Sequence, residues 1–307
     1  MANLKTYGSV PQAGQSRIRQ RICLKDSGGG KNSSYPTKLH IATYKIRTLK
    51  SLERLIRLEE ELSEVKWDIL GLCETRLAGE KCTTLEPGHV MYQNNKENNT
   101  HTGGVALLIN KKIKHLVTKM RSISGRVIYI VAKISQRYSL QIIQVYAPTS
   151  TAPDEEIEQL YEGISTALRS ESTYFKIITG DFNAKLGITR DARGQRLGRF
   201  GTGTRNTRGD ALINFLQSEN LFCMNSFFQK PENRRWTWRS PDSTYKNEID
   251  FTLSNKKYIV KDVTVLNQFD TDSDHRLVRA KVQINTRAER NTHQKNPIPN
   301  PKRTEAK

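Results

Sequence analysis

Short runs of apolar residues, bounded by polar turns, recur along most of the chain and predict a domain built mainly from β-strands. Apolar runs of about four to eight residues are typical of strands buried on both faces. We predict strands at residues 39–46, 68–73, 103–109, 126–133, 140–146, 175–180, 221–225, 249–253, 263–266 and 277–284. Many strands with few helices predict an α/β fold in which two stacked sheets are covered by helices.

Apolar residues at helical spacing predict three helices, at residues 52–65, 154–168 and 209–218. The second of these helices is preceded by Pro153 and has acidic residues in its first turn. Both features favour a helix N-terminus, because proline fits the first turn and negative charge stabilises it.

Polar residues that directly follow apolar strands are the candidate functional residues. The run at 175–180 ends in Gly180, and Asp181 and Asn183 come next. In an extended backbone, side chains two residues apart lie on the same side. A carboxylate and a carboxamide aimed at one point suit a hard divalent cation and a phosphate that it holds. The alternative is an ordinary strand followed by an Asx-type turn.

The same pattern recurs at other predicted strand ends and inside one apolar strand. The full set is Glu74, Tyr146, Asp181, Asn183, Asp250, Asp274 and His275. It contains hard oxygen ligands, an orienting carboxylate, an imidazole and a phenol. These are the groups needed to hydrolyse a phosphodiester.

From about residue 38 to residue 284, the order of these residues resembles the endonuclease/exonuclease/phosphatase superfamily. The blocks that carry the resemblance are 41–49, 72–76, 103–106, 144–148, 180–183, 237–238, 249–250 and 273–275. The amino-acid sequences of these blocks most resemble craniofacial development protein 2-like proteins. Those proteins are similar to the endonuclease of RTE-type, and more broadly LINE-type, retrotransposons. The resemblance implies an abasic-endonuclease-like, four-layer α/β/β/α sandwich of two mainly antiparallel sheets.

The resemblance also implies metal-assisted hydrolysis of a phosphodiester. Glu74 would hold Mg²⁺ or Mn²⁺, with Asp274 as a further candidate ligand. Asp181 would activate the attacking water, and Asn183 would bind the phosphate or orient that water. For Glu74 the alternative is a helix-capping or salt-bridging acid, with Arg76 as its partner.

Three more residues complete this implied mechanism. His275 would contact the scissile phosphate, while Asp250 or Asp274 would fix its tautomer. Tyr146 would stabilise charge on the phosphorane or on the leaving group. The alternatives are a structural role for the histidine and a packing role for the tyrosine, which stands at a strand end.

Lys45 departs from the family pattern. It follows Tyr44 at a position where the family carries an Asn that helps to bind the metal or its water shell. An ammonium group has no acceptor to offer a cation. We therefore expect Lys45 to point away from the site, to have a lowered pKa, or to weaken metal binding. Another alternative is that it replaces part of the metal's charge against the phosphate.

Basic and aromatic residues predict a nucleic-acid surface. Trp238 lies in an arginine-rich segment, which suits stacking and phosphate pairing, although a core position is equally compatible. Residues 187–209 form a basic, glycine-containing segment that includes Arg205 and Arg208. We predict that both arginines bind substrate from a mobile loop; the alternative is a solvated loop.

Composition and charge limit the remaining possibilities. The chain has 307 residues and a net charge of +19, of which residues 1–38 carry +6 and residues 286–307 carry +4. We expect these two segments to be disordered basic tails around one domain at 39–285. The excess charge favours a polyanion partner, DNA first and RNA second. The bland alternative is a basic surface that aids solubility.

The sequence has no apolar stretch long enough for a membrane span and no signal-peptide pattern. Its four cysteines are scattered, which fits a reducing intracellular compartment. We expect an intracellular monomer, in the nucleus rather than the cytoplasm, with no cofactor other than metal.

A metal-dependent DNA endonuclease is therefore the predicted function, and three alternatives stay open. The first is a phosphatase or ribonuclease on the same fold, because one fold hosts many functions. The second is a DNA- or chromatin-binding protein with an inactive site, which Lys45 favours. The third is a fragment of a larger element, in which case the chain is the nuclease alone.

Overall fold

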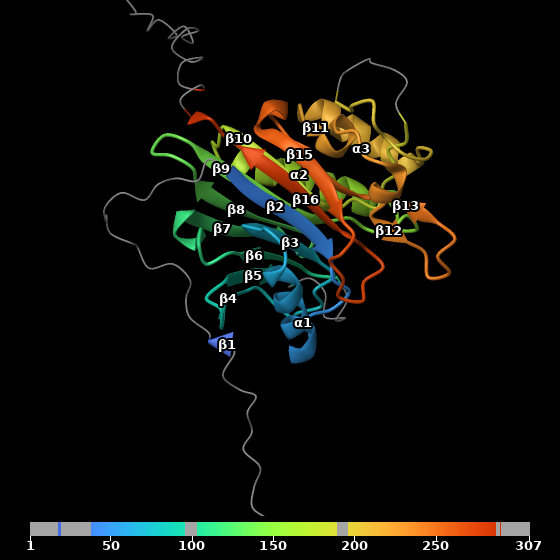
Figure 1. The fold of residues 1–307 in the computed structure, drawn as a ribbon. Coiled ribbons are helices and arrows are strands. Elements are labelled where there is room, and N and C mark those ends of the chain that lie inside the picture. Colours follow the sequence, from blue (N-terminus) through green and yellow to red (C-terminus); the bar gives the residue numbers. More distant parts are fainter. Residues whose placement is uncertain (1–17, 20–37, 96–102, 189–195, 287–288, 290–307) are drawn as a thin grey trace, which may run out of the picture.

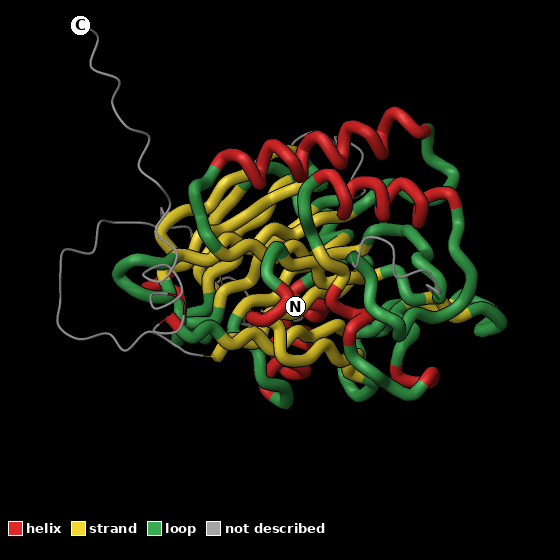
Figure 2. The backbone as a smooth tube through the Cα atoms, turned by 90° about the horizontal axis from the view of Figure 1, so that it is seen from above, coloured by secondary structure: helices red, strands yellow, loops and turns green. Residues whose placement is uncertain are grey.

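The computed structural model describes residues 18–19, 38–95, 103–188, 196–286 and 289, and shows two sheets stacked face to face (Figure 1). One sheet has eight strands and the other has six. Helix α1 (Leu52–Ser63) covers the outer face of the larger sheet, and helices α2 (Asp154–Ser170) and α3 (Thr207–Ser218) cover the outer face of the smaller one (Figures 1 and 2). The predicted α/β/β/α sandwich is confirmed.

The larger sheet has the strand order β1 (Ile18–Arg19), β4 (Lys81–Leu85), β5 (Val90–Asn94), β6 (Val105–Ile109), β3 (Ile69–Cys73), β2 (Lys38–Lys45), β16 (Leu277–Gln283) and β15 (Val260–Leu266). The smaller sheet has the order β11 (Phe222–Cys223), β14 (Asp250–Ser254), β10 (Phe175–Asp181), β9 (Ser139–Tyr146), β8 (Val127–Lys133) and β7 (Val117–Ser124). A separate hairpin pairs β12 (Trp238–Arg239) with β13 (Lys246–Asn247). Short 3₁₀ turns occupy Lys114–Leu116, Met224–Phe227, Glu232–Arg234 and Lys257–Ile259.

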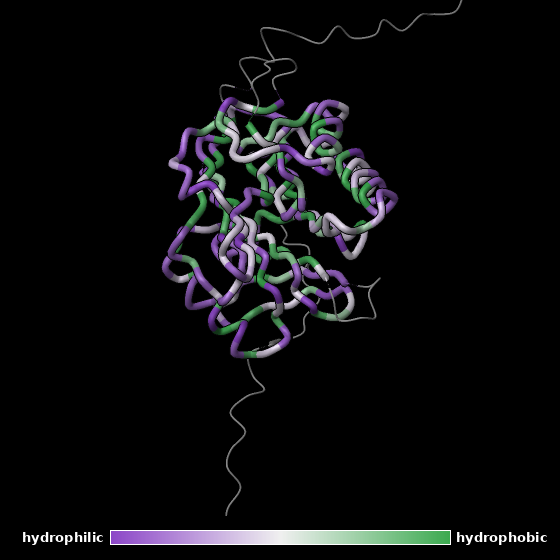
Figure 3. The backbone as a smooth tube through the Cα atoms, turned by 90° about the vertical axis from the view of Figure 1, so that its right-hand side faces the viewer, coloured by the Kyte–Doolittle hydropathy of each residue, from purple (hydrophilic) through white to green (hydrophobic). Residues whose placement is uncertain are grey.

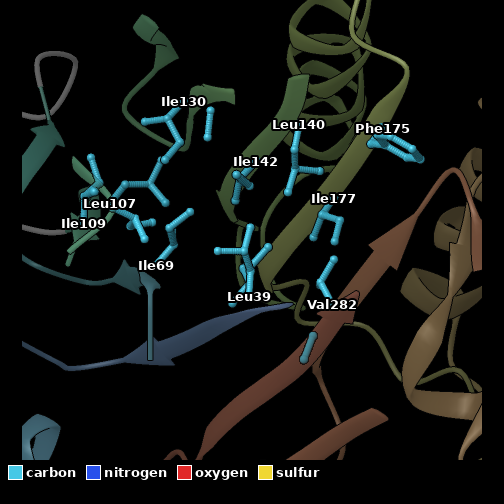
Figure 4. Packing of buried hydrophobic residues seen from close by; sticks show 14 of the residues in the cluster. Leu39, Ile69, Leu107, Ile109, Ile130, Leu140, Ile142, Phe175, Ile177 and Val282 are labelled. Carbon is cyan, nitrogen blue, oxygen red and sulfur yellow. The ribbon is translucent and has the colours of Figure 1, made fainter. Parts of the chain in front are cut away.

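Three buried apolar clusters separate the four layers. The central cluster lies between the sheets and joins residues such as Ile69 and Leu107 of the larger sheet to Ile142 and Ile177 of the smaller one (Figure 4). Alternate residues on the same strands face outward into the two other clusters, against the helices. This burial of both strand faces explains the continuous apolar runs in the sequence. The helices instead carry hydrophobic and hydrophilic residues in alternation (Figure 3).

Local signals fix where the helices begin. The Ser51 side chain accepts a hydrogen bond from the Arg54 amide at 3.3 Å, and the Asn206 side chain accepts one from the Gly209 amide at 2.9 Å. Each satisfies an amide that the first helical turn leaves free. The Asn206 cap sets the start of α3 just inside the loop that follows the candidate site.

Most predicted elements are confirmed, with a shift of a few residues at their ends. The prediction missed β4, β5 and β7 and the two-residue strands β1, β12 and β13, and only Phe222–Cys223 of the predicted strand at 221–225 is extended. Strand β7 is an edge strand with many exposed polar residues, so its sequence lacks a continuous apolar run. Within the described residues, the helices are too short or too polar to cross a membrane. Most of the two predicted tails, and residues 189–195 of the basic segment, lie outside the described residues.

Each large sheet contains one parallel pair among otherwise antiparallel strands. These pairs are β2 with β3 and β9 with β10. Their carboxyl ends carry Lys45, Glu74, Tyr146 and Asp181, so the candidate residues from two sheets meet at one end of the sandwich. Strand β14 runs antiparallel to β10 and places Asp250 opposite Asp181.

A buried polar side chain ties the two sheets together close beneath these strand ends. The Gln144 amide donates to the Thr43 hydroxyl at 3.0 Å and accepts a hydrogen bond from the Thr179 hydroxyl at 2.8 Å. Its side chain lies directly over Gly71, where an added Cβ would stand 1.7 Å from Gln144 Oε1. Glycine is therefore required at position 71 for the sheets to approach this closely.

We expect Gly71→Ala to lower the free energy of unfolding by about 1–3 kcal/mol, as overpacking of a dense core does. The held Gln144 side chain cannot move aside without losing its hydrogen bonds. Chemical denaturation followed by circular dichroism measures the change. Gly163→Ala in α2 is the matched control, because its added Cβ would meet ordinary contacts at 3.7 Å. An unchanged stability of Gly71→Ala would contradict this account of the sheet contact.

Candidate active site

The candidate residues form three donor–acceptor pairs at the shared strand ends. Lys45 pairs with Asp181, His275 with Asp250, and Tyr146 with Glu74. A 4.0 Å separation of His275 Nε2 from Asp181 Oδ2 links the first two pairs, and a 5.1 Å separation of the Lys45 ammonium from the Tyr146 ring centre links the third. Strands β2, β9, β10 and β14, the turn after β3 and the segment before β16 supply these side chains.

The backbone around the site adopts conformations that L-residues rarely take. Glu74 and Asn183, each just after a strand, have φ angles of 56° and 47°. Gly180 has a φ of 152°, and an added Cβ there would stand 2.0 Å from the Val145 carbonyl oxygen. Left-handed backbone at non-glycine residues costs free energy and tends to occur at functional sites. The sharp turn after each strand aims the next polar side chain back across the strand ends.

Asp181 is fully buried, and both of its carboxylate oxygens accept hydrogen bonds. Oδ1 accepts from the Asn183 amide at 2.9 Å, and Oδ2 accepts from the Lys45 ammonium at 3.1 Å. The Asn183 side chain donates its own hydrogen bond to the Ala147 carbonyl at 2.9 Å. An Asx-type turn and a position in the cluster therefore occur together, and the two interpretations of this motif do not exclude each other.

Lys45 points into the site and is charged there. Its side chain is 12% exposed. Burial by itself lowers the pKa of this ammonium, but the neighbouring Asp181, Tyr146 and Glu74 outweigh that effect and raise the pKa above its usual value. Two of the expected alternatives, a side chain directed away from the site and a lowered pKa, therefore do not describe the structure.

His275 is buried against Asp250. Its Nδ1 lies 2.8 Å from Asp250 Oδ2, while Nε2 has no hydrogen-bond partner among the described residues. Burial would lower the pKa of this imidazole, but the Asp250 and Asp181 carboxylates overcome it and raise the pKa. The Thr237 hydroxyl accepts hydrogen bonds from the Ile249 and Asp250 amides and so positions the aspartate. Of the two aspartates expected to orient the histidine, the structure places Asp250 beside it.

Tyr146 connects the two sheets through its phenol. The hydroxyl donates to Glu74 Oε1 at 3.1 Å, and the guanidinium of Arg126 lies 5.5 Å from the centre of the ring. Burial raises the pKa of this phenol, so it remains a donor at neutral pH. The sequence did not single out Arg126, whose position beside a polar strand end only the pairing of β8 with β9 reveals.

Asp274 is engaged on the outer side of the cluster. Its Oδ2 accepts a hydrogen bond from the Trp238 indole at 2.9 Å, and its Oδ1 lies 4.0 Å from Arg47 Nε. No contact among the described residues joins it to Glu74. Trp238 is half-buried in this arrangement. Two residues earlier, the centre of the Trp236 ring lies 3.1 Å from the Arg276 guanidinium.

The two arginines predicted to bind substrate contact the protein itself. Arg205 donates to the Leu186 carbonyl at 3.1 Å, with its side chain 35% exposed. The Arg208 side chain is 9% exposed; it pairs with Asp154 at 2.7 Å and donates to the Ala152 carbonyl. Both contacts tie the start of α3 to neighbouring loops. The structure brings neither arginine into contact with the three pairs.

The described residues include a possible metal site of acidic and histidine side chains. Asp181, Asp250 and His275 can place ligand atoms within 4.8 Å of one another. Carboxylate oxygens are the ligands that a hard divalent cation prefers. The acids of this set and Glu74, which accepts from Tyr146, are therefore the donors that fit such an ion.

Known proteins resemble this chain in sequence or in fold. Residues 140–279 match the family described as Endonuclease-reverse transcriptase. The chain is 30% identical over 247 residues to Craniofacial development protein 2 of Bos taurus, a match that covers 80% of this chain and 41% of that protein. The chain thus spans less than half the length of this curated relative.

Solved structures show the same architecture. The AP endonuclease LMAP from Leishmania major superposes with a TM-score of 0.61 and 13% identity, over 81% of this chain and 89% of that one. The endonuclease domain of TRAS1, a telomere-specific non-LTR retrotransposon, superposes with a TM-score of 0.56 and 14% identity, over 80% and 98%. At these identities the comparison establishes the fold, and the predicted resemblance is confirmed at that level.

The His275 pair can be tested by its titration. We expect the His275 imidazole to titrate above 6.5, and Asp250→Asn to lower that midpoint by about one unit or more, since a carboxylate in contact favours the charged ring. Proton NMR of the histidine ring signals measures both values. His89, whose pKa burial and nearby lysines lower, serves as the internal reference and should not move.

The sign of the linked stability follows from the same shift. A pKa raised by folding means that this pair stabilises the fold fully below about pH 6.5, and that the contribution disappears as the pH rises through the folded-state value. A His275 midpoint at or below that of His89 would contradict this assignment.

Proposed function

We propose that this chain, which carries a domain of the endonuclease/exonuclease/phosphatase superfamily, is a metal-dependent DNA endonuclease that hydrolyses phosphodiester bonds. The observation that carries the proposal is the meeting of the three pairs at one end of the sandwich. Carboxylates, an imidazolium, a phenol and an ammonium from two sheets lie within a few ångströms of one another there. This set can orient water, bind phosphate oxygens and neutralise developing charge.

The roles follow from the contacts of each group. Asp181 orients the attacking water and accepts its proton, while Asn183 holds the turn that aims this carboxylate. Asp250 orients His275 through Nδ1 and raises its pKa, which leaves Nε2 to donate to a phosphate oxygen. The Tyr146 phenol, still protonated at neutral pH, donates to the developing negative charge.

Glu74 is the residue that we propose to hold a divalent cation, Mg²⁺ or Mn²⁺. The fit rests on its carboxylate, which is partly exposed and uses one oxygen to accept from Tyr146. Hard oxygen donors of this kind are the ligands that Mg²⁺ prefers. Such an ion supplies charge neutralisation at the phosphate. We do not assign this role to Asp274, because the Trp238 indole and Arg47 occupy its oxygens.

DNA is the substrate that the charge supports best. The net charge of +19 favours a polyanion, and the hairpin β12–β13 adds a basic and aromatic face next to His275. On this face the Arg276 guanidinium lies 3.1 Å from the centre of the Trp236 ring, and the Lys246 ammonium lies 5.2 Å from it. Cations held over an aromatic ring in this way can pair with phosphates. The retrotransposon endonuclease domain of the same fold supports the same choice.

A second candidate is a protein that binds DNA or chromatin without cleaving it. The ion pair of Lys45 with Asp181 favours this candidate, because it occupies the carboxylate that would activate water. The two candidates differ in a simple way. A binding protein holds DNA with a salt-dependent and metal-independent affinity, whereas an endonuclease also cleaves the DNA.

Nicking of supercoiled plasmid in Mg²⁺ distinguishes them. We expect the wild type to nick, Asp181→Asn to lose about 10²–10⁴-fold in rate because the water is no longer activated, and Glu74→Gln to lose at least about tenfold. Agarose-gel conversion of supercoiled to open-circular DNA measures each rate.

Glu158→Gln, which removes a carboxylate from the exposed surface of α2, is the control for loss of charge alone and should nick like the wild type. Equal nicking by the wild type and Asp181→Asn would indicate a contaminating nuclease. Tight DNA binding without nicking at any Mg²⁺ concentration would favour the second candidate.

A further inference from the structure

The ammonium of Lys45 occupies a position in the site that is suited to a cation. It lies 3.1 Å from Asp181 Oδ2 and 5.1 Å from the centre of the Tyr146 ring. The same phenol donates to Glu74 Oε1 at 3.1 Å. Negative or electron-rich groups thus face this ammonium from strands β9 and β10 and from the turn after β3. A small cation is the kind of group that such a set attracts.

Both oxygens of Asp181 already have donors. Lys45 donates to Oδ2, and the Asn183 amide donates to Oδ1 at 2.9 Å. The Asn183 amide belongs to the backbone turn and moves only if that turn rearranges. A divalent ion that binds Asp181 must therefore displace the lysine ammonium from Oδ2, or share the carboxylate with a positive charge in contact with it.

The position of Lys45 in the sheet holds its ammonium there. Residue 45 pairs with Cys73 in the parallel register of β2 with β3. Its carbonyl accepts a hydrogen bond from the Ser273 hydroxyl at 2.5 Å, and the Ser273 hydroxyl in turn accepts from the His275 amide at 3.0 Å. These contacts fix the backbone of Lys45 on both sides, with its ammonium held at Asp181 Oδ2. A neutral, shorter side chain here would leave the Asp181 oxygen open.

We propose that Lys45 is a tethered cation that holds Asp181 in the place of a divalent ion, and that this one residue makes the site bind divalent metal weakly. The inference rests on the proposed function, since it takes the three pairs to be the site of phosphodiester hydrolysis. Its direct consequence concerns metal affinity in the absence of DNA. Removal of the ammonium should open one carboxylate oxygen and make the site more negative by one charge.

The experiment is a titration of the full chain with Mn²⁺ and no DNA, followed by the electron paramagnetic resonance signal of the free ion. We expect the wild type to bind with a dissociation constant on the order of 1 mM or weaker. Lys45→Asn and Lys45→Gln should each bind Mn²⁺ at least about tenfold more tightly. Adding Glu74→Gln to Lys45→Asn should abolish the gain, which places the ion at this cluster.

Lys133→Asn is the matched control, because it removes one positive charge from the exposed opposite end of the smaller sheet. It should leave the Mn²⁺ affinity unchanged. Thermal unfolding shows whether each Lys45 variant is folded. If neither variant folds, the Mn²⁺ dissociation constant of the wild type alone tests the proposal. Wild-type binding in the low micromolar range, or equal affinities of the wild type and folded Lys45 variants, would overturn the proposal.

Failure of this inference differs from failure of the proposed function. If the wild type never nicks DNA and Lys45→Asn binds Mn²⁺ more tightly than the wild type, the inference is supported and the natural chain is not an active endonuclease. A wild type that nicks DNA at low metal concentration, with no gain of Mn²⁺ in Lys45→Asn, retains the function and rejects the inference.

Discussion

The face-to-face packing of the two sheets is the constraint on which the site depends, because the candidate residues come from strands of different sheets. Lys45 and Glu74 lie at the carboxyl ends of the parallel pair of the larger sheet, whereas Tyr146 and Asp181 lie at those of the parallel pair of the smaller one. A shift of one sheet against the other would separate every donor from its acceptor. The central apolar cluster supplies the bulk of the adhesion, and the Gln144 contacts over Gly71 fix the alignment near the strand ends.

Burial of Asp181 explains why a cation is needed beside it even without substrate. A fully buried carboxylate without a partner costs several kcal/mol, and pairing with Lys45 offsets much of that cost. The same pairing opposes a second cation. Between a unit charge and a divalent ion at ~5 Å, with an effective dielectric near 20, the repulsion is about 7 kcal/mol. One residue thus favours the fold of the unliganded site and disfavours its metal-bound form.

Sequence patterns predicted the fold class and nearly all of the central strands, since those strands are buried on both faces and read as apolar runs. They missed β4, β5 and β7, whose exposed or polar residues interrupt such runs. For the site, the patterns identified the members of all three pairs but not the pairing itself. Asp250 and Asp274 were equally good partners for His275 in sequence, and only the antiparallel register of β10 with β14 brings Asp250 to it. Tertiary contacts also explain why Arg208 does not face the candidate site: its guanidinium forms an ion pair with Asp154.

The neighbouring acids raise the pKa of Lys45 and of His275, and burial raises the pKa of Tyr146, so folding favours the protonated form of each donor in the three pairs. Each donor is also paired with one carboxylate, while His275 Nε2 has no hydrogen-bond partner among the described residues. In the proposed function a phosphate can accept directly from His275 Nε2, but it can use Lys45 or Tyr146 only by taking that donor from Asp181 or Glu74. These carboxylates would then need a new source of positive charge. A divalent ion that arrives with the phosphate would supply that charge, so that under the proposed function the binding of metal and of phosphate would be mutually dependent. Under this proposal a divalent ion replaces the Lys45 ammonium at Asp181. The strength of the Lys45–Asp181 pair then sets how much of this replacement the binding of substrate must drive.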